Sequence, residues 1–83
     1  ILIMSNITYS KQLIQLGLNI ARYRKMRGLT QEELSSRIHM SRTHLSNLEA
    51  PGKVTSVSLE KLFAIAEALQ VHPSVLLAEF SQP

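Results

Sequence analysis

Four polar side chains between residues 42 and 47 have the types and spacing needed to read base pairs. At helical spacing Arg42, Thr43, Ser46 and Asn47 share the outer face of one short helix. An arginine binds guanine O6 and N7 bidentately, a threonine meets thymine or other base edges, and an asparagine binds adenine or holds a phosphate. These residues therefore predict direct contact with bases in the major groove. For Arg42, the alternative is an arginine that is simply solvated at the surface.

Two short helices joined by a tight turn must hold this face in place, and residues 30–49 fit that arrangement. Thr30 can cap the first helix, with Glu33 reaching back to complete a capping box. Ser41 can cap a second helix of about eight residues, whose two leucines face inward. This is the shape of a helix-turn-helix, which places its second helix in the major groove of DNA.

Apolar residues at helical spacing predict three further helices around this pair. Ser10 can cap a first helix that ends before Gly28, Ser58 can cap a fourth, and Pro73 suits the first position of a fifth. The expected helices span about 11–26, 30–38, 41–49, 58–69 and 73–80. With no strand pattern, the predicted fold class is all-α. We expect residues 1–9 to form a flexible N-terminal arm and residues 10–83 a single domain.

The composition excludes several classes of protein. The 83 residues include no Cys and no Asp, which rules out disulfides, Cys-ligated zinc and most catalytic triads or carboxylate metal clusters. His39, His44 and His72 are not spaced as metal ligands on one helix, so we assign them structural or DNA-edge roles. No apolar run approaches the roughly 20 residues of a membrane span, and no segment directs export. We expect a cytoplasmic protein that is not an enzyme, with no cofactor, metal or small-molecule ligand.

The positive charge is concentrated in the first part of the chain. Residues 1–53 hold eight Lys and Arg against three Glu, whereas residues 54–83 hold one Lys against three Glu. This asymmetry, within a net charge of +3, favours a polyanionic partner such as double-stranded DNA. The alternative for charge alone is a solubilising surface.

From Leu16 to Phe80 the chain resembles the Cro/phage-repressor-like helix-turn-helix family, also called the XRE family. The matching residues are Leu16-Gly17, Ile20, Arg24, Gly28-Leu29-Thr30-Gln31-Glu32-Glu33-Leu34, Met40-Ser41, Leu45, Leu48-Glu49, Ser58-Leu59 and Ile65-Ala66-Glu67-Ala68-Leu69. The resemblance implies a repressor-like DNA-binding domain, with the helix over about 41–49 as the recognition helix.

The resemblance also implies roles for single residues. Gln31 matches the family's glutamine that binds a phosphate at the start of the second helix, a position where free amides already favour anions. Arg24 and Glu49 match a structural ion pair that fixes the angle of the recognition helix; the alternative is that Arg24 is another phosphate ligand. Ser41 and His44, at the start and edge of the recognition helix, are further candidates for phosphate contact.

The sequence departs from the family pattern at three places. Ser35 replaces a small alanine, and His39 replaces the turn glycine at a site that usually needs a positive φ. After the recognition helix, Glu49-Ala50-Pro51-Gly52 replaces the common Glu-Arg-Gly and lengthens the next loop. This change affects the downstream phosphate contacts, for which Lys53, helped by the hydroxyls of Thr55 and Ser56, is the candidate.

Residues 40–46 are most similar to the controller proteins of restriction–modification systems, which are small dimers. We expect the last helix, through Leu76, Leu77 and Phe80, to form a dimer interface; the alternative is that it packs on the core of its own protomer. The predicted function is a homodimeric, sequence-specific transcriptional regulator of a near-palindromic operator, autoregulatory or a restriction–modification controller. The alternative is an antitoxin or a protein-interaction module of the same fold.

Overall fold

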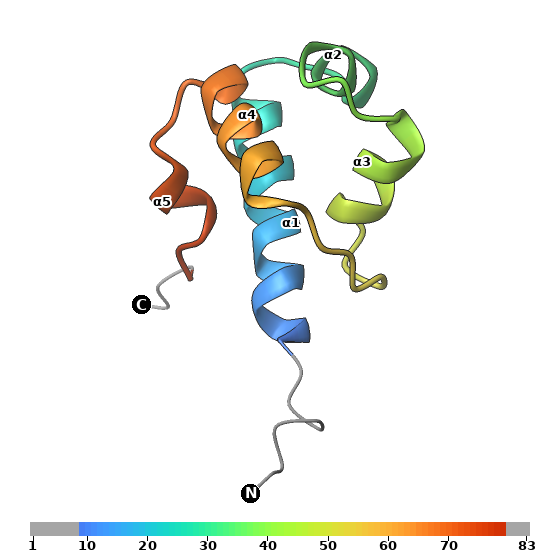
Figure 1. Cartoon of the computed structure of the whole chain (residues 1–83), viewed down its shortest axis with the longest axis vertical. Coiled ribbons are helices and arrows are strands. Elements are labelled where there is room, and N and C mark those ends of the chain that lie inside the picture. Colours follow the sequence, from blue (N-terminus) through green and yellow to red (C-terminus); the bar gives the residue numbers. More distant parts are fainter. Residues whose placement is uncertain (1–8, 80–83) are drawn as a thin grey trace, which may run out of the picture.

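The computed structural model describes residues 9–79, and over that range the chain forms five helices and no strand. The helices are α1 (Ser10–Met26), α2 (Gln31–Arg37), α3 (Arg42–Glu49), α4 (Leu59–Leu69) and α5 (Pro73–Leu76). α1 is the long central helix, with α2 and α3 on one side and α5 on the other (Figure 1). The all-α fold predicted from the sequence is confirmed.

Local sequence signals start four of the helices. Thr30 caps α2: its hydroxyl accepts from the Glu33 amide at 3.0 Å, and the Glu33 carboxylate accepts from the Thr30 amide at 2.8 Å. Ser41 and Ser58 cap α3 and α4 in the same way, each accepting from the amide three residues on. The His72 ring accepts from an amide in the first turn of α5. Because these bonds satisfy free N–H groups within a few residues, the sequence alone predicts them.

The two ends of the helical region differ from the prediction. α1 begins at Ser10 itself, and Tyr9 before it makes no side-chain capping bond, so the assignment of Ser10 as a cap was wrong. α5 has a single turn that ends at Leu76, with Leu77 as its C-cap, and therefore does not continue toward residue 80. Phe80 and the arm predicted over residues 1–8 lie outside the described residues.

One apolar core joins all five helices. Its fully or almost fully buried side chains are Leu16, Ile20, Leu34, Ile38, Met40, Leu45, Leu48, Leu62, Ile65, Ala66, Leu69 and Leu76. Their burial removes most of the apolar stripe of each helix from water, which is the main stabilising term for a domain of this size. Leu59 and Phe63 of α4 have the same helical spacing as its buried residues but remain 63% and 51% exposed.

α1 and α3 approach each other most closely at a glycine. A Cβ at Gly17 would lie 3.0 Å from the carbonyl carbon of Leu48 and closer still to its oxygen. Only a residue without a side chain allows the last turn of α3 to lie against the backbone of α1. Gly17 therefore sets the distance between α3 and the rest of the fold.

A buried ion pair fixes the same two helices about two turns further along α1. Arg24 Nε donates to Glu49 Oε2 at 2.8 Å and its Nη2 to Oε1 at 2.9 Å, while Nη1 donates to the Leu29 carbonyl at 2.7 Å. Only 10% of the Arg24 side chain and 4% of the Glu49 side chain are exposed. The planar bidentate contact fixes direction as well as distance between α1 and α3.

Side chains from other helices bind the carbonyl groups at three helix ends. Lys61 of α4 donates to Ile38 O at 2.7 Å, at the end of α2, and Arg27 donates to Leu69 O at 2.7 Å, at the end of α4. Asn19, fully buried on α1, donates to Leu76 O at 2.9 Å and to Ala78 O at 2.7 Å, at the end of α5. These bonds attach the ends of α2, α4 and α5 to neighbouring helices, which also satisfies carbonyls that have no partner within their own helix.

We predict that Gly17→Ala lowers the free energy of unfolding by at least about 2 kcal/mol, because α1 and α3 must separate to admit the methyl group. Urea unfolding followed by circular dichroism measures this. Gly52→Ala is the matched control, since a Cβ there meets no atom within 4 Å; its midpoint should match wild type. Equal stability of the two variants would contradict the close approach of α1 and α3.

We predict that Glu49→Gln lowers the free energy of unfolding by about 3–5 kcal/mol, because it leaves the guanidinium of Arg24 buried without a carboxylate. Because glutamine has nearly the same side-chain volume as glutamate, the loss of unfolding free energy measures the effect of the charge rather than of packing. The control is Glu67→Gln on the exposed face of α4, which should change stability by no more than about 0.5 kcal/mol. The same small effect in Glu49→Gln would show that the pair does not hold α3.

Candidate nucleic-acid interface

The outer face of α3 carries the four side chains that the sequence marked for base contact. Arg42, Thr43, Ser46 and Asn47 line one open pocket of about 310 Å³ on this face. The first three are exposed and Asn47 is half-buried. The two leucines of α3 are buried behind them, so the helix presents a polar face on a fixed apolar base. The face offers a guanidinium, two hydroxyls and an amide, all groups that hydrogen-bond to base edges.

The turn before α3 leaves the residues at the start of α3 exposed. His39 adopts a left-handed conformation with φ 55°, as the turn position required, although it is not glycine. The Ser41 hydroxyl accepts from the His44 amide at 3.0 Å, which leaves its proton free to donate to a phosphate. Both Ser41 and His44 are exposed at this end of α3. The two expected phosphate contacts therefore flank the proposed base-reading face.

Gln31, expected to contact a phosphate, belongs to the ion-pair network. Its Nε2 donates to Glu49 Oε1 at 2.9 Å, so the start of α2 is tied to the end of α3. The amide nitrogen has two hydrogens, and the second is available to another acceptor. Gln31 can thus hold the two helices together and still donate outward.

The capping box at the same end of α2 also stabilises the negative charge of the Glu33 carboxylate. The backbone amide of Thr30 and then its hydroxyl lower the pKa of the Glu33 carboxyl below its usual value, and these effects outweigh the small cost of desolvation. The carboxylate is therefore kept ionised next to the partial positive charge of the helix N-terminus. This holds Gln31, one residue past the cap, in a defined position.

The loop after α3 folds back along the recognition helix. Lys53 Nζ donates to Asn47 Oδ1 at 3.1 Å, and Thr55 Oγ1 donates to the Asn47 carbonyl at 3.4 Å. Further on, Ser56 O lies 3.4 Å from His44 Nε2, a contact that requires the proton on that ring nitrogen. Lys53, proposed from sequence as a phosphate ligand, thus lies directly beside the predicted base-contact face.

The residues expected at a dimer interface are divided between core and surface. Leu76 is fully buried in the core of its own protomer, which was the alternative to a dimer contact. Its side chain is therefore not available to a partner. Leu77 is 61% exposed, and Phe80 lies outside the described range. The sequence pattern did not reveal that α5 ends after one turn, which changes the face on which these residues lie.

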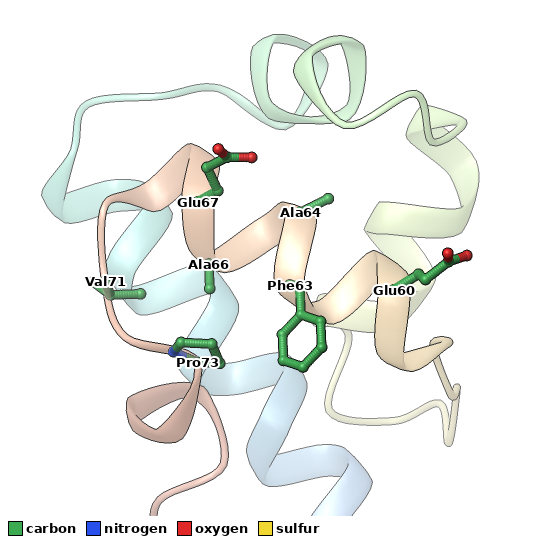
Figure 2. Close-up of a pocket in the computed structure, with 7 residues that line it drawn as sticks. All are labelled: Glu60, Phe63, Ala64, Ala66, Glu67, Val71 and Pro73. Atoms are coloured by element: carbon green, nitrogen blue, oxygen red, sulfur yellow. The ribbon is translucent and has the colours of Figure 1, made fainter.

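An exposed apolar surface, separate from the polar face of α3, runs along α4 and the start of α5. A pocket of about 590 Å³ lies there. Its lining residues, drawn in Figure 2, are Glu60, Phe63, Ala64, Ala66, Glu67, Val71 and Pro73. The exposed Leu59 lies one helical turn before Phe63 on the same helix. Phe63 and Leu59 follow the same helical spacing as the buried apolar residues of α4, and no local signal distinguishes them from those residues.

Over residues 9–79, no group of three or more His, Asp or Glu side chains is arranged to hold a metal ion. The three histidines instead serve the turn before α3, the edge of α3 and the cap of α5. Within the same range, no helix has the length and apolar character needed to cross a membrane.

Comparison with known proteins places this geometry in a family. The sequence pattern of the helix-turn-helix family matches residues 20–76. The restriction-modification controller protein C.AhdI from Aeromonas hydrophila has a similar structure, with 28% identity and a TM-score of 0.71 over 82% of this chain and 98% of that one. No curated protein sequence matches the chain.

Two other solved structures are similar to a comparable extent. SinR, the master regulator for biofilm formation, solved in complex with DNA, is 28% identical, with a TM-score of 0.69 over 76% of this chain and 98% of that one. The clp gene regulator ClgR from C. glutamicum is 30% identical, with a TM-score of 0.70 over 80% and 83%. The match of the family pattern over most of the chain, with a polar recognition helix on the described fold, shows that the chain belongs to the XRE-type helix-turn-helix family of DNA-binding transcriptional regulators.

Proposed function

We propose that this regulator binds a near-palindromic operator as a homodimer, with α3 of each protomer in the major groove. The observation that carries the proposal is the outer face of α3, where Arg42, Thr43, Ser46 and Asn47 line one pocket. α3 has eight residues and reaches only a few base pairs. Two copies, one helical turn of DNA apart (roughly 34 Å), give a dimer enough sequence information to select a site.

Backbone contacts supply most of the affinity in this proposal. Gln31, Ser41, His44 and Lys53 are the phosphate contacts, arranged at the start of α2 and at both ends of α3. The excess of Lys and Arg over Glu in residues 1–53 adds a positive field on this part of the chain. Since each neutralised phosphate releases counterions, binding should weaken steeply as salt rises.

A second copy of the chain is proposed to cover the exposed apolar side chains Leu59, Phe63 and Leu77. These side chains are among the most exposed large apolar groups of the described residues. They lie on α4 and after α5, while base contacts are assigned to α3, so pairing through them leaves both recognition helices free (Figure 1). The rival reading, an antitoxin-like module, places a different protein on this surface.

A controller role is supported by two of the similar structures. C.AhdI and C.Esp1396I are both restriction-modification controller proteins, and the second is 26% identical to this chain. The described residues include no separate sensing domain, and dimerisation couples occupancy of an operator to protein concentration. A regulator controlled in this way suits autoregulation of its own gene.

Fluorescence anisotropy on the DNA upstream of its own gene tests the function, with a scrambled duplex as the competitor and a series of salt concentrations. The expected result is a preference for the upstream DNA that persists at physiological salt. Equal, steeply salt-dependent affinity for both duplexes would contradict autoregulation, and the absence of binding to either would contradict the DNA-binding surface on α3.

We predict that Arg42→Ala reduces operator affinity by about 1–3 kcal/mol and relaxes base preference at one position in each half-site. The loss follows from removing a bidentate contact to guanine. Competition anisotropy with single-base operator variants measures it. Arg22→Ala, an exposed arginine of α1, controls for the loss of one charge and should keep the base preference. An unchanged preference in Arg42→Ala would show that Arg42 does not contact a base.

We predict that Phe63→Glu weakens the dimer at least tenfold, because it places a carboxylate in the proposed apolar interface beside Glu60 and Glu67. Analytical ultracentrifugation over a concentration series measures the dissociation constant. Leu18→Glu is the control, since Leu18 is an exposed leucine on α1. A dimer of equal strength in both variants, or a wild-type chain that stays monomeric until a different protein is added, would contradict this interface.

A further inference from the structure

The contact between Lys53 and Asn47 joins the loop after α3 to the base-reading face. Lys53 Nζ donates to Asn47 Oδ1 at 3.1 Å across six residues of chain. Two backbone contacts support this position of the loop: the Lys53 amide donates to Ala50 O at 3.1 Å, and Thr55 Oγ1 donates to Asn47 O at 3.4 Å. The loop therefore holds both the side chain and the main chain of Asn47.

The chemistry of the lysine decides how the Asn47 amide is oriented. An ammonium group has three donors and no acceptor, so the atom of Asn47 that faces it must be the oxygen. The Asn47 nitrogen, with two hydrogens, then points away from Lys53. Asn47 also lines the pocket on the outer face of α3, together with Arg42 and Ser46. The amide thus presents its donors away from Lys53, with one of the two lone pairs of Oδ1 bound to the ammonium.

The orientation of the oxygen changes which base suits Asn47. An asparagine reads adenine through two bonds, accepting from N6–H and donating to N7, and this needs Oδ1 and Nδ2 to face the base edge together. The bond from Lys53 instead directs Oδ1 toward the loop. A donor alone fits the acceptors of the major groove instead, namely O6 and N7 of guanine or O4 of thymine. We propose that Lys53 is a specificity-determining residue that makes Asn47 select guanine or thymine over adenine. The inference rests on the DNA-binding function proposed above, with α3 in the major groove.

This role differs in a measurable way from phosphate binding by Lys53. A lysine that only contacts a phosphate contributes equally on every sequence and adds about one unit to the salt slope. A lysine that acts through Asn47 changes the relative affinity for different bases at one position of each half-site. Base preference and salt dependence therefore separate the two roles in one set of titrations.

The experiment selects duplexes from a randomised 24-base-pair library with the full chain, and then measures affinities for all four bases at the position that Asn47→Ala relaxes. The variants are Lys53→Met, which keeps a similar stem without the donor, and Lys53→Arg, which keeps a donor. Lys25→Met, an exposed lysine at the end of α1, controls for loss of charge. Lys53→Met in the Asn47→Ala background tests whether the effect passes through Asn47, and thermal unfolding confirms that every variant is folded.

The expected result is that wild type disfavours adenine at this position, and that Lys53→Met raises the relative affinity for adenine by about fivefold or more. Lys53→Arg should restore the wild-type preference, Lys25→Met should keep it, and Lys53→Met should have no effect on preference when Asn47 is alanine. A uniform loss on all four bases with a smaller salt slope would overturn the inference and leave Lys53 as a phosphate ligand. A wild-type chain that enriches no sequence would overturn the proposed function, and this inference with it.

Discussion

The buried ion pair between Arg24 and Glu49 is the constraint on which the recognition surface depends. Glu49 is the last residue of α3, and its two oxygens accept bonds from Arg24 of α1 and Gln31 of α2. Three helices are therefore tied at one carboxylate. Gly17 admits the same end of α3 against the backbone of α1. A charge pair of this kind adds little net stability, because both charges lose their hydration, but it defines one angle for α3, the helix proposed to enter the groove.

Polar side chains from neighbouring segments also fix the ends of other helices in the fold. Gly28 closes α1 with a positive φ, but the positive-φ positions that follow α2 and α4 are occupied by His39 and Gln70 rather than by glycine. Side chains from neighbouring helices then donate to the carbonyls at these ends: Lys61 to the end of α2 and Arg27 to the end of α4. Since all buried side-chain polar atoms of the described residues have partners, this small domain orients its helices through polar contacts that also satisfy their ends.

Prediction from the sequence succeeded where the determining interactions are local. The caps at Thr30, Ser41 and Ser58 depend on bonds to residues three positions away, and periodic leucines identify the buried face of α3. Prediction failed where exposure or a helix end depends on an element that is distant in the sequence. Leu59 and Phe63 fit the apolar stripe of α4 yet no helix of the described chain covers them. α5 ends after one turn, and the carbonyls at its end are bound by Asn19 of the distant helix α1. Asn19 did carry a signal, since it lies between Leu16 and Ile20 on the apolar stripe of α1, where an asparagine requires buried partners.

The departures from the family pattern lie at the two ends of the recognition helix, and the framework that holds this helix keeps the family residues. Arg24, Glu49 and Gln31 match the pattern and form one network, whereas His39 replaces the glycine of the turn before α3 and Pro51-Gly52 lengthens the loop after it. The longer loop brings Lys53 back onto Asn47. Because the loop lies outside the ion-pair network, its length and residues can vary without changing the angle of α3. Under the proposed function, a fixed helix with a variable neighbouring loop would let sequence preference change while the fold and the orientation of α3 stay the same.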